Sequence, residues 1–328
     1  MNHTYFIGID VAKAKFDVAW LRDHETLKFL NKVFKNHRSN FSELTDWLRK
    51  NVTDDFTQIH VTLEPTGVYH LALAHFLHDL GCWVQLINPA RLPAFAASKA
   101  NVHKTDKKDS CLLARFGREN PSERWIPEPA LIRELKSKAT RMEALKQDIL
   151  RETNRLEKAE FAESPQEVID SIKKVIAVLR DEIIALKNDI DQRIDDDPTL
   201  KNDRELLQSI PSVAEVCSLH MLLLYHSRPF ERAAQMAAFV GLIPRVRESG
   251  VLRGRTVLSK KGSPSLRKLL YMPAVCATIR NPDIKAQYER LIANGKNKKL
   301  AIGAAMRRLV HICFGVLKHQ KPYQAKCA

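Results

Sequence analysis

The sequence predicts an α/β domain, then a helical hairpin, then a mainly helical region. Three observations predict this order. Short apolar runs alternate with helical patterns in residues 1–125, a heptad pattern of apolar residues occupies part of 126–200, and helical spacing with many basic residues fills 201–328. Alternating strands and helices build layered sheets, whereas consecutive helices pack on one another. We therefore expect three domains with these boundaries.

Five apolar runs in the first part have the length of strands. In chain order they are YFIGID, KFDVAWL, LKFLNKV (27–33), IHVTLE (59–64) and CWVQLIN (82–88). Helical spacing follows the third run in FSELTDWLRK, and again at 68–80, at 89–97 and after residue 105. The order β-β-β-α-β-α-β-α predicts a mixed sheet with helices on both faces.

The second part contains an unbroken heptad seam. Its apolar residues recur in steps of three and four at Ile169, Ile172, Ile176, Leu179, Ile183, Leu186 and Ile190. A looser stripe precedes it, and Ser164-Pro165 separates the two. This pattern predicts a helical hairpin or coiled coil. Its seam either packs within its own chain or serves as a dimerisation element, and the strict spacing favours the second interpretation.

The last part contains several further helices. LLQSIPSVAEVCSLHMLLLY is typical of two helices joined at Pro211, and FERAAQMAAFVGLIP predicts another. A basic loop then leads into a helix, and residues 299–318 form the last predicted helix.

The 328 residues carry a net charge of +15, which is concentrated near the end of the chain. From Arg228 onward there are 21 Lys and Arg against 4 Asp and Glu, a net of +17, so the first 227 residues have a net of −2. A strongly basic region joined to a neutral one predicts contact with a polyanion, and nucleic acid is favoured over an anionic membrane.

The chain has no N-terminal signal pattern and no unbroken apolar run of about 18 residues. Its six cysteines are scattered and form no C-x-x-C pair, which favours reduced thiols over a zinc site or disulfides. We therefore expect a cytoplasmic protein with no membrane partner.

Four acids suggest a metal site. Asp10 and Glu64 end predicted strands, while Asp106 and Asp109 lie three residues apart in HKTDKKDS, among Lys104, Lys107 and Lys108. That stretch alone is also typical of a solvated helix end capped by Thr105. Carboxylates gathered at one sheet edge would repel each other unless a cation held them, and two Mg²⁺ ions can flank a phosphodiester. The lysines would then steer the phosphate backbone.

Several motifs resemble one known family. GIDVAKAKFDV, LEPTGVYH, VQLINPARLPAFA and NVHKTDKKDSCLLARF resemble the RuvC-like, RNase H-type N-terminal domain of DEDD-type insertion-sequence transposases. LLQSIPSV, FERAAQMAAFVGLIPRVRESG, LSKKGSPSLRKLLYMPA and GAAMRRLVHICFGVLK resemble that family's C-terminal transposase domain. The resemblance runs from Tyr5 to about Tyr323. It implies a recombinase guided by a structured non-coding (bridge) RNA, with Asp10, Glu64, Asp106 and Asp109 as ligands of two Mg²⁺ ions.

The resemblance also implies a serine nucleophile at Ser249. A serine hydroxyl needs activation or positive surroundings, and arginines flank this one. Ser259, Ser263 and Ser265 are competing candidates. The residues that we expect to contact nucleic acid here are Arg245, Arg247, Arg253, Arg255, Lys260, Lys261, Arg267 and Lys268.

The family's reaction implies two transesterifications through a phosphoserine. It also implies a composite site, with the acids of one subunit and the serine of another, in a homodimer or tetramer. Base pairing between RNA and DNA would choose the target, and the protein would be found on nucleoid DNA.

One turn departs from the family pattern. IPSVAE (210–215) stands where related sequences commonly have a Pro-Gly-x-Gly turn, with Ser212 and Ala214 in place of the glycines. Glycines there let backbone N–H groups approach phosphate, so phosphate binding by this turn is in doubt.

Three other functions fit parts of the sequence. An actin-like ATPase shares the first hairpin, but the chain has only 11 glycines and no glycine-rich phosphate loop. A metal-dependent endonuclease or Holliday-junction resolvase would use water in place of the serine. A basic RNA-binding scaffold would use the acids only as helix caps.

Overall fold

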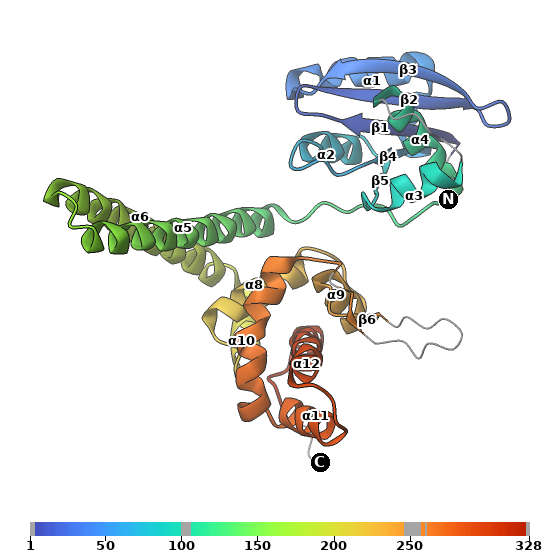
Figure 1. The fold of residues 1–328 in the computed structure, drawn as a ribbon. Coiled ribbons are helices and arrows are strands. Elements are labelled where there is room, and N and C mark those ends of the chain that lie inside the picture. Colours follow the sequence, from blue (N-terminus) through green and yellow to red (C-terminus); the bar gives the residue numbers. More distant parts are fainter. Residues whose placement is uncertain (1–3, 100–105, 246–256, 260, 326–328) are drawn as a thin grey trace. The chain divides into compact units, whose positions relative to one another are not determined.

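The computed structural model describes residues 4–99, 106–245, 257–259 and 261–325. They form two compact units, Met1–Pro127 and Glu128–Ala328, each of which is described by itself (Figure 1).

The first unit is built on a mixed five-stranded sheet. Its strands are β1 (Tyr5–Val11), β2 (Lys15–Asp23), β3 (Lys28–Lys35), β4 (Ile59–Leu63) and β5 (Trp83–Leu86). The spatial order is β3-β2-β1-β4-β5, with β1, β2 and β3 antiparallel and β4 and β5 parallel to β1. The predicted fold class is confirmed.

Helices cover both faces of this sheet (Figure 1). On one face, α1 (Phe41–Asn51) and α2 (Leu71–Asp79) enclose the main core of the unit. On the other face lies α4 (Asp106–Glu119), with α3 (Arg91–Ser98) packed against it. Two short 3₁₀ helices, Arg38–Asn40 and Phe56–Gln58, precede α1 and β4.

Strand alternation decides which residues meet which helices. Ile7, Ile9 and Val11 point into the core beneath α1 and α2, so Gly8 and Asp10 belong to the opposite side. We call that side the α4 face. Small and polar residues are concentrated there, which lets a helix approach the strands closely.

The second unit begins with a long hairpin of α5 (Ala130–Phe161) and α6 (Gln166–Asp195) (Figure 1). Seam residues Ile169, Ile176 and Ile190 are buried, and α6 packs along α5. Much of the seam is therefore used inside the chain, as in the first of the two interpretations above. Near Ile132 and Ile190, the base of the hairpin shares its core with the C-terminal helices.

Six further helices complete this unit within its described residues. They are α7 (Pro198–Gln208), α8 (Glu215–His226), α9 (Ala233–Val240), α10 (Pro264–Arg280), α11 (Pro282–Ala293) and α12 (Lys298–His319). A two-residue ladder joins β6 (Pro244–Arg245) to β7 (Val257–Leu258). The sequence analysis missed α11, although Asn281 caps it and Pro282 opens it.

Helix α12 is long and apolar enough to cross a membrane by length and composition. Arg307 and Arg308 interrupt the run, so a search for unbroken apolar segments passes over it. More than half of its apolar window is buried, and Leu309, Val310 and Cys313 belong to the C-terminal core. Packing within the unit accounts for its composition.

Candidate active site

Asp10 and Glu64 lie at neighbouring strand ends. Strands β1 and β4 run parallel, with Ile9 opposite Leu63 as the last pair, and Asp10 and Glu64 are the residues that directly follow this pair. Both side chains are partly exposed. The structure thus brings together two of the four predicted ligands.

Close backbone packing sets α4 above β1. A Cβ atom added to Gly8 would lie 2.0 Å from the Ser110 carbonyl oxygen and 2.3 Å from the Ala114 nitrogen. Gly8 is two residues before Asp10, and Ser110 follows Asp109. The first turn of α4, with partly exposed Asp109, therefore lies near the end of β1. We call Asp10, Glu64 and this turn the carboxylate edge.

A second glycine holds the other end of α4. A Cβ atom on Gly117 would lie 2.1 Å from Thr62 Oγ1, and that hydroxyl donates to Gln85 Oε1 at 3.5 Å. Gly8 and Gly117 thus fix the helix at both ends against β1 and β4. The sequence analysis did not single out either glycine.

Asn36 ties together two loops beside the carboxylate edge. Its Nδ2 donates to Ala12 O at 2.9 Å and to Tyr69 O at 3.2 Å. Ala12 belongs to the β1–β2 turn, and Tyr69 to the loop after Glu64. In that loop His70 is buried, and burial lowers the pKa of its imidazole. A neutral, buried ring at this point supports the loop rather than contacting an anion.

The acids fit a hard divalent ion in donor chemistry and in strand register. Among the residues that the structure describes, no group of three or more His, Cys, Asp or Glu side chains is arranged to hold a metal. Asp10, Glu64 and Asp109 therefore do not form such a group by themselves, and the side chain of the fourth predicted ligand, Asp106, lies outside the described part. Its backbone forms the first residue of α4, three positions before Asp109.

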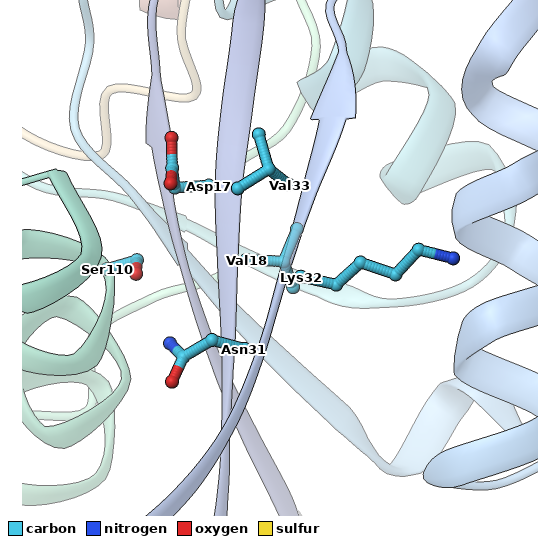
Figure 2. Close-up of a pocket in the computed structure, with 6 residues that line it drawn as sticks. All are labelled: Asp17, Val18, Asn31, Lys32, Val33 and Ser110. Atoms are coloured by element: carbon cyan, nitrogen blue, oxygen red, sulfur yellow. The ribbon is translucent and has the colours of Figure 1, made fainter.

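Asp17 is an acid of this site that the sequence analysis missed. It lies directly opposite Asp10 across the β1–β2 ladder, is buried, and pairs with Lys15 Nζ at 3.1 Å. With Ser110 and Asn31 it lines a cavity of about 260 Å³ between β2, β3 and α4 (Figure 2). The hairpin register read from KAKFD would have found it, since a short turn fixes the pairing.

The serine candidates divide into two groups. Ser249 lies outside the described residues. Ser259 donates through its N–H to Ile243 O at 2.8 Å, and Ser263 caps α10 by accepting from Leu266 N at 3.3 Å. Ser265 lies 2.8 Å from Ser263 through their hydroxyl oxygens. The hydroxyls of Ser263 and Ser265 thus make local contacts at the start of α10.

The basic residues predicted to contact nucleic acid differ in their surroundings. Lys108, Lys261 and Lys268 are exposed. Arg267 instead donates to the carbonyls of Val240 and Gly262 at 3.0 and 3.1 Å, so its guanidinium joins the end of α9 to the start of α10. The remaining predictions concern side chains outside the described part, namely Lys104, Lys107, Arg245, Arg247, Arg253, Arg255 and Lys260.

The turn at residues 210–215, which departs from the family's Pro-Gly-x-Gly pattern, has a backbone conformation that favours glycine. Ser212, between α7 and α8, has φ of +79°. Its hydroxyl is buried without a hydrogen-bond partner. A backbone conformation that favours glycine is thus present, although the residue is not glycine.

Comparison with known proteins agrees with both halves of the chain. A family model for the DEDD domain of IS110 elements, described as "Transposase", matches residues 7–159, and "Transposase IS116/IS110/IS902 family" matches residues 204–289. The chain is 32% identical to the pilin gene-inverting proteins of Moraxella bovis and Moraxella lacunata, over 99% of each chain. It is 21% identical to an uncharacterised 43.6 kDa protein of insertion element IS110 from Streptomyces coelicolor, over 48% of this chain and 38% of that protein. The chain belongs to the IS110-type transposases, a family of enzymes that act on DNA.

Proposed function

We propose that the protein recombines DNA at specific sites, cutting and rejoining strands through a covalent serine intermediate. The observation that carries this proposal is the carboxylate edge, where strand register sets Asp10 beside Glu64 and the Gly8 contact seats α4. Two relatives similar along the whole chain are named for inverting a pilin gene, so DNA inversion is the outcome we favour.

In this proposal Asp10, Glu64, Asp106 and Asp109 hold two Mg²⁺ ions. When bound, such ions neutralise charge on a phosphodiester and its leaving oxygen. The protein's own part in this proposal is to keep the four acids at one edge, which is supported by the register of β1 with β4 and by the close contact of α4 with Gly8.

Ser249 is the proposed nucleophile. Its Oγ forms a bond to a DNA phosphorus, the bond from phosphorus to the strand oxygen breaks, and that oxygen leaves as a hydroxyl after taking up the serine proton. A hydroxyl of the partner strand then attacks the phosphoserine and releases the serine. Each step exchanges one phosphodiester for another, so no ATP is consumed.

A structured non-coding RNA is the proposed guide, and a second copy of the chain is the proposed partner. The net charge of +17 from Arg228 onward supports binding to nucleic acid. We place the protein in the cytoplasm, on nucleoid DNA. Purification from the native locus, followed by sequencing of the nucleic acid that comes with it, tests the guide: a discrete RNA from the gene's flanks is the expected result.

Trapping the protein on labelled target DNA tests the chemistry. We expect a denaturant-resistant protein–DNA adduct that Ser249→Ala abolishes and Ser259→Ala retains. Asp10→Ala and Glu64→Ala should also abolish it. If Ser249→Ala still cuts DNA, and no variant or wild-type protein forms an adduct, hydrolysis by a resolvase-like endonuclease replaces the serine mechanism.

A further inference from the structure

We propose that Lys15 binds a phosphate of the strand at the carboxylate edge and that Asp17 is the positioning residue that holds Lys15 there. The proposal rests on the proposed function and adds a cation to its set of acids. It is carried by the register of the β1–β2 hairpin and by the unequal burial of this pair.

Strand alternation places the pair on the α4 face. Asp17 lies opposite Asp10 in the ladder, so the two side chains emerge on the same side of the sheet. Lys15 is two residues before Asp17 on β2 and shares its side. The ammonium of Lys15 therefore belongs to the same sheet face as Asp10.

The two partners are buried to very different extents. The Asp17 side chain is 11% exposed and the Lys15 side chain 45%, with 3.1 Å between Nζ and Oδ2. An exposed pair of flexible side chains contributes little to stability. Here the Asp17 side chain is buried and holds one end of the pair, while nearly half of the Lys15 side chain is exposed to solvent.

The backbone around Lys15 is also fixed. The Ala12 N–H donates to Lys15 O at 2.9 Å and closes the hairpin turn. Asn36 holds the same turn from β3, since its backbone N–H donates to Ala14 O at 2.9 Å and its side chain donates to Ala12 O. A lysine on so constrained a turn loses little further freedom when it binds an anion.

Charge balance explains why two acids can face each other here. Like charges directly opposite on neighbouring strands destabilise a sheet. Lys15 offsets the charge of Asp17 through their ion pair. Lys32 also lines the Asp17 cavity, but it points away from Asp17 (Figure 2), and its Nζ lies 4.9 Å from the centre of the Phe34 ring.

Lysine chemistry suits the proposed role. An ammonium is a compact charge with three donors, and it can contact a non-bridging phosphate oxygen without a fixed geometry. Such donors are most effective where negative charge develops in the transition state. The class of ligand is therefore a phosphodiester of the nucleic acid strand being cut.

The test uses the full-length protein and its target DNA. Single-turnover cleavage is measured across a Mg²⁺ titration, and DNA affinity without metal across a salt titration. We expect Lys15→Met to lower the cleavage rate at least about tenfold, as for other lost transition-state donors. The half-saturating Mg²⁺ concentration should not change, and the salt slope of binding should fall by about 1. Lys15→Arg should restore part of the rate.

Asp17→Asn should act through the same interaction. We expect a smaller loss of rate than in Lys15→Met, and the double variant should be no slower than Lys15→Met alone, because both remove one coupled contact. Lys13→Ala removes an exposed lysine of the same turn and is the matched control, with wild-type rate and Mg²⁺ dependence expected.

Three results would overturn the proposal. One is a wild-type rate in Lys15→Met. Another is a Lys15→Met variant whose melting temperature falls while its cleavage rate, Mg²⁺ dependence and salt slope stay at wild-type values. The third is an increase in the half-saturating Mg²⁺ concentration for Asp17→Asn while Lys15→Met stays active, which would make Asp17 a metal ligand. Asp10→Ala separates the two proposals: if it still cuts DNA, the proposed function fails, whatever Lys15 does.

Discussion

Gly8 of β1 and Ser110 of α4 are in backbone contact, with no room for a Cβ atom between them. The helix that carries Asp106 and Asp109 can thus lie this close to β1 only because Gly8 has no side chain. The close approach of the helix is what requires glycine at this position. Its backbone conformation does not, since its φ is outside the left-handed region. This contact leads to the first prediction.

Gly8→Ala should displace α4 and cost about 3 kcal/mol of stability, at the upper end of typical overpacking effects. DNA cleavage should fall further than the loss of folded protein explains, because Asp109 moves away from Asp10. Denaturant unfolding and cleavage per folded molecule are the measurements. Gly315→Ala, in open space within α12, is the control and should be neutral or stabilise by about 0.5–1 kcal/mol. Equal effects of the two changes would contradict the role of Gly8.

Asp10→Asn should abolish cleavage and weaken the stabilisation of the folded protein by Mg²⁺, because it removes one of the proposed metal ligands. Added Mg²⁺ should raise the melting temperature of the wild type, since it binds only the folded state, and should raise that of the variant much less. Thermal melts with and without Mg²⁺ check both points. A lower melting temperature for the metal-free variant would show that Asp10 has a structural role.

Ser212→Gly should stabilise the second unit by about 1 kcal/mol, because glycine adopts φ of +79° without the Cβ strain of serine. It also removes a buried hydroxyl with no partner. Ser209→Gly is the matched control, three residues earlier. Ser209 Oγ accepts from Tyr323 N at 2.8 Å and donates to Leu206 O, so its loss should cost about 1 kcal/mol. Shifts of the same sign in denaturant midpoint would refute the backbone argument.

Substitutions on the buried side of the α5–α6 hairpin should affect folding, and those on its exposed side should affect self-association. Ile176 is buried in the seam, whereas Val175 and Val178 are exposed on α6. Val175→Asp together with Val178→Lys should leave helicity intact, and it should reduce the mass measured by light scattering if the proposed second copy binds this exposed side of α6. Ile176→Asp should lower the melting temperature, because it buries a charge. An unchanged mass in the double variant would exclude this surface as the interface.

Cysteine reactivity should follow burial. Burial raises the pKa of Cys82 and of Cys217 to about 12, and that of Cys313 well above its ordinary value. These thiols stay protonated from pH 7 to 10, so they should react slowly over that whole range. Exposed Cys276 should react quickly, and Cys276→Ser should remove one fast-labelled site. If the wild type has one more rapidly labelled thiol than Cys82→Ser, then Cys82 is accessible and the first unit opens, which would contradict the prediction.

The sequence predicted the sheet because its signals are local. Each strand ends at an acid or a turn, and the position of Asp10 and Glu64 at neighbouring strand ends follows from the order of elements. The seam from Ile169 to Ile190 was equally clear as a helix, but its partner could not be chosen, since a heptad pattern fits a helix of the same chain as well as another copy. The contacts of α4 were out of reach of the sequence, because Gly8 on β1 and Gly117 on α4 matter only once this helix packs across β1 and β4. Asp17 could have been found, since the short turn of the first hairpin sets it opposite Asp10.

The seating of α4 also bears on how mobile elements decay. Of the four proposed metal ligands, Asp10 lies on β1 and Glu64 directly follows β4, whereas Asp106 and Asp109 lie on α4, whose position leaves no room for a side chain at Gly8. A genomic copy can therefore retain all four acids and still encode an inactive protein after a change in the Gly8 codon. Surveys that seek functional copies among the many in bacterial genomes should check that codon as well as the acids.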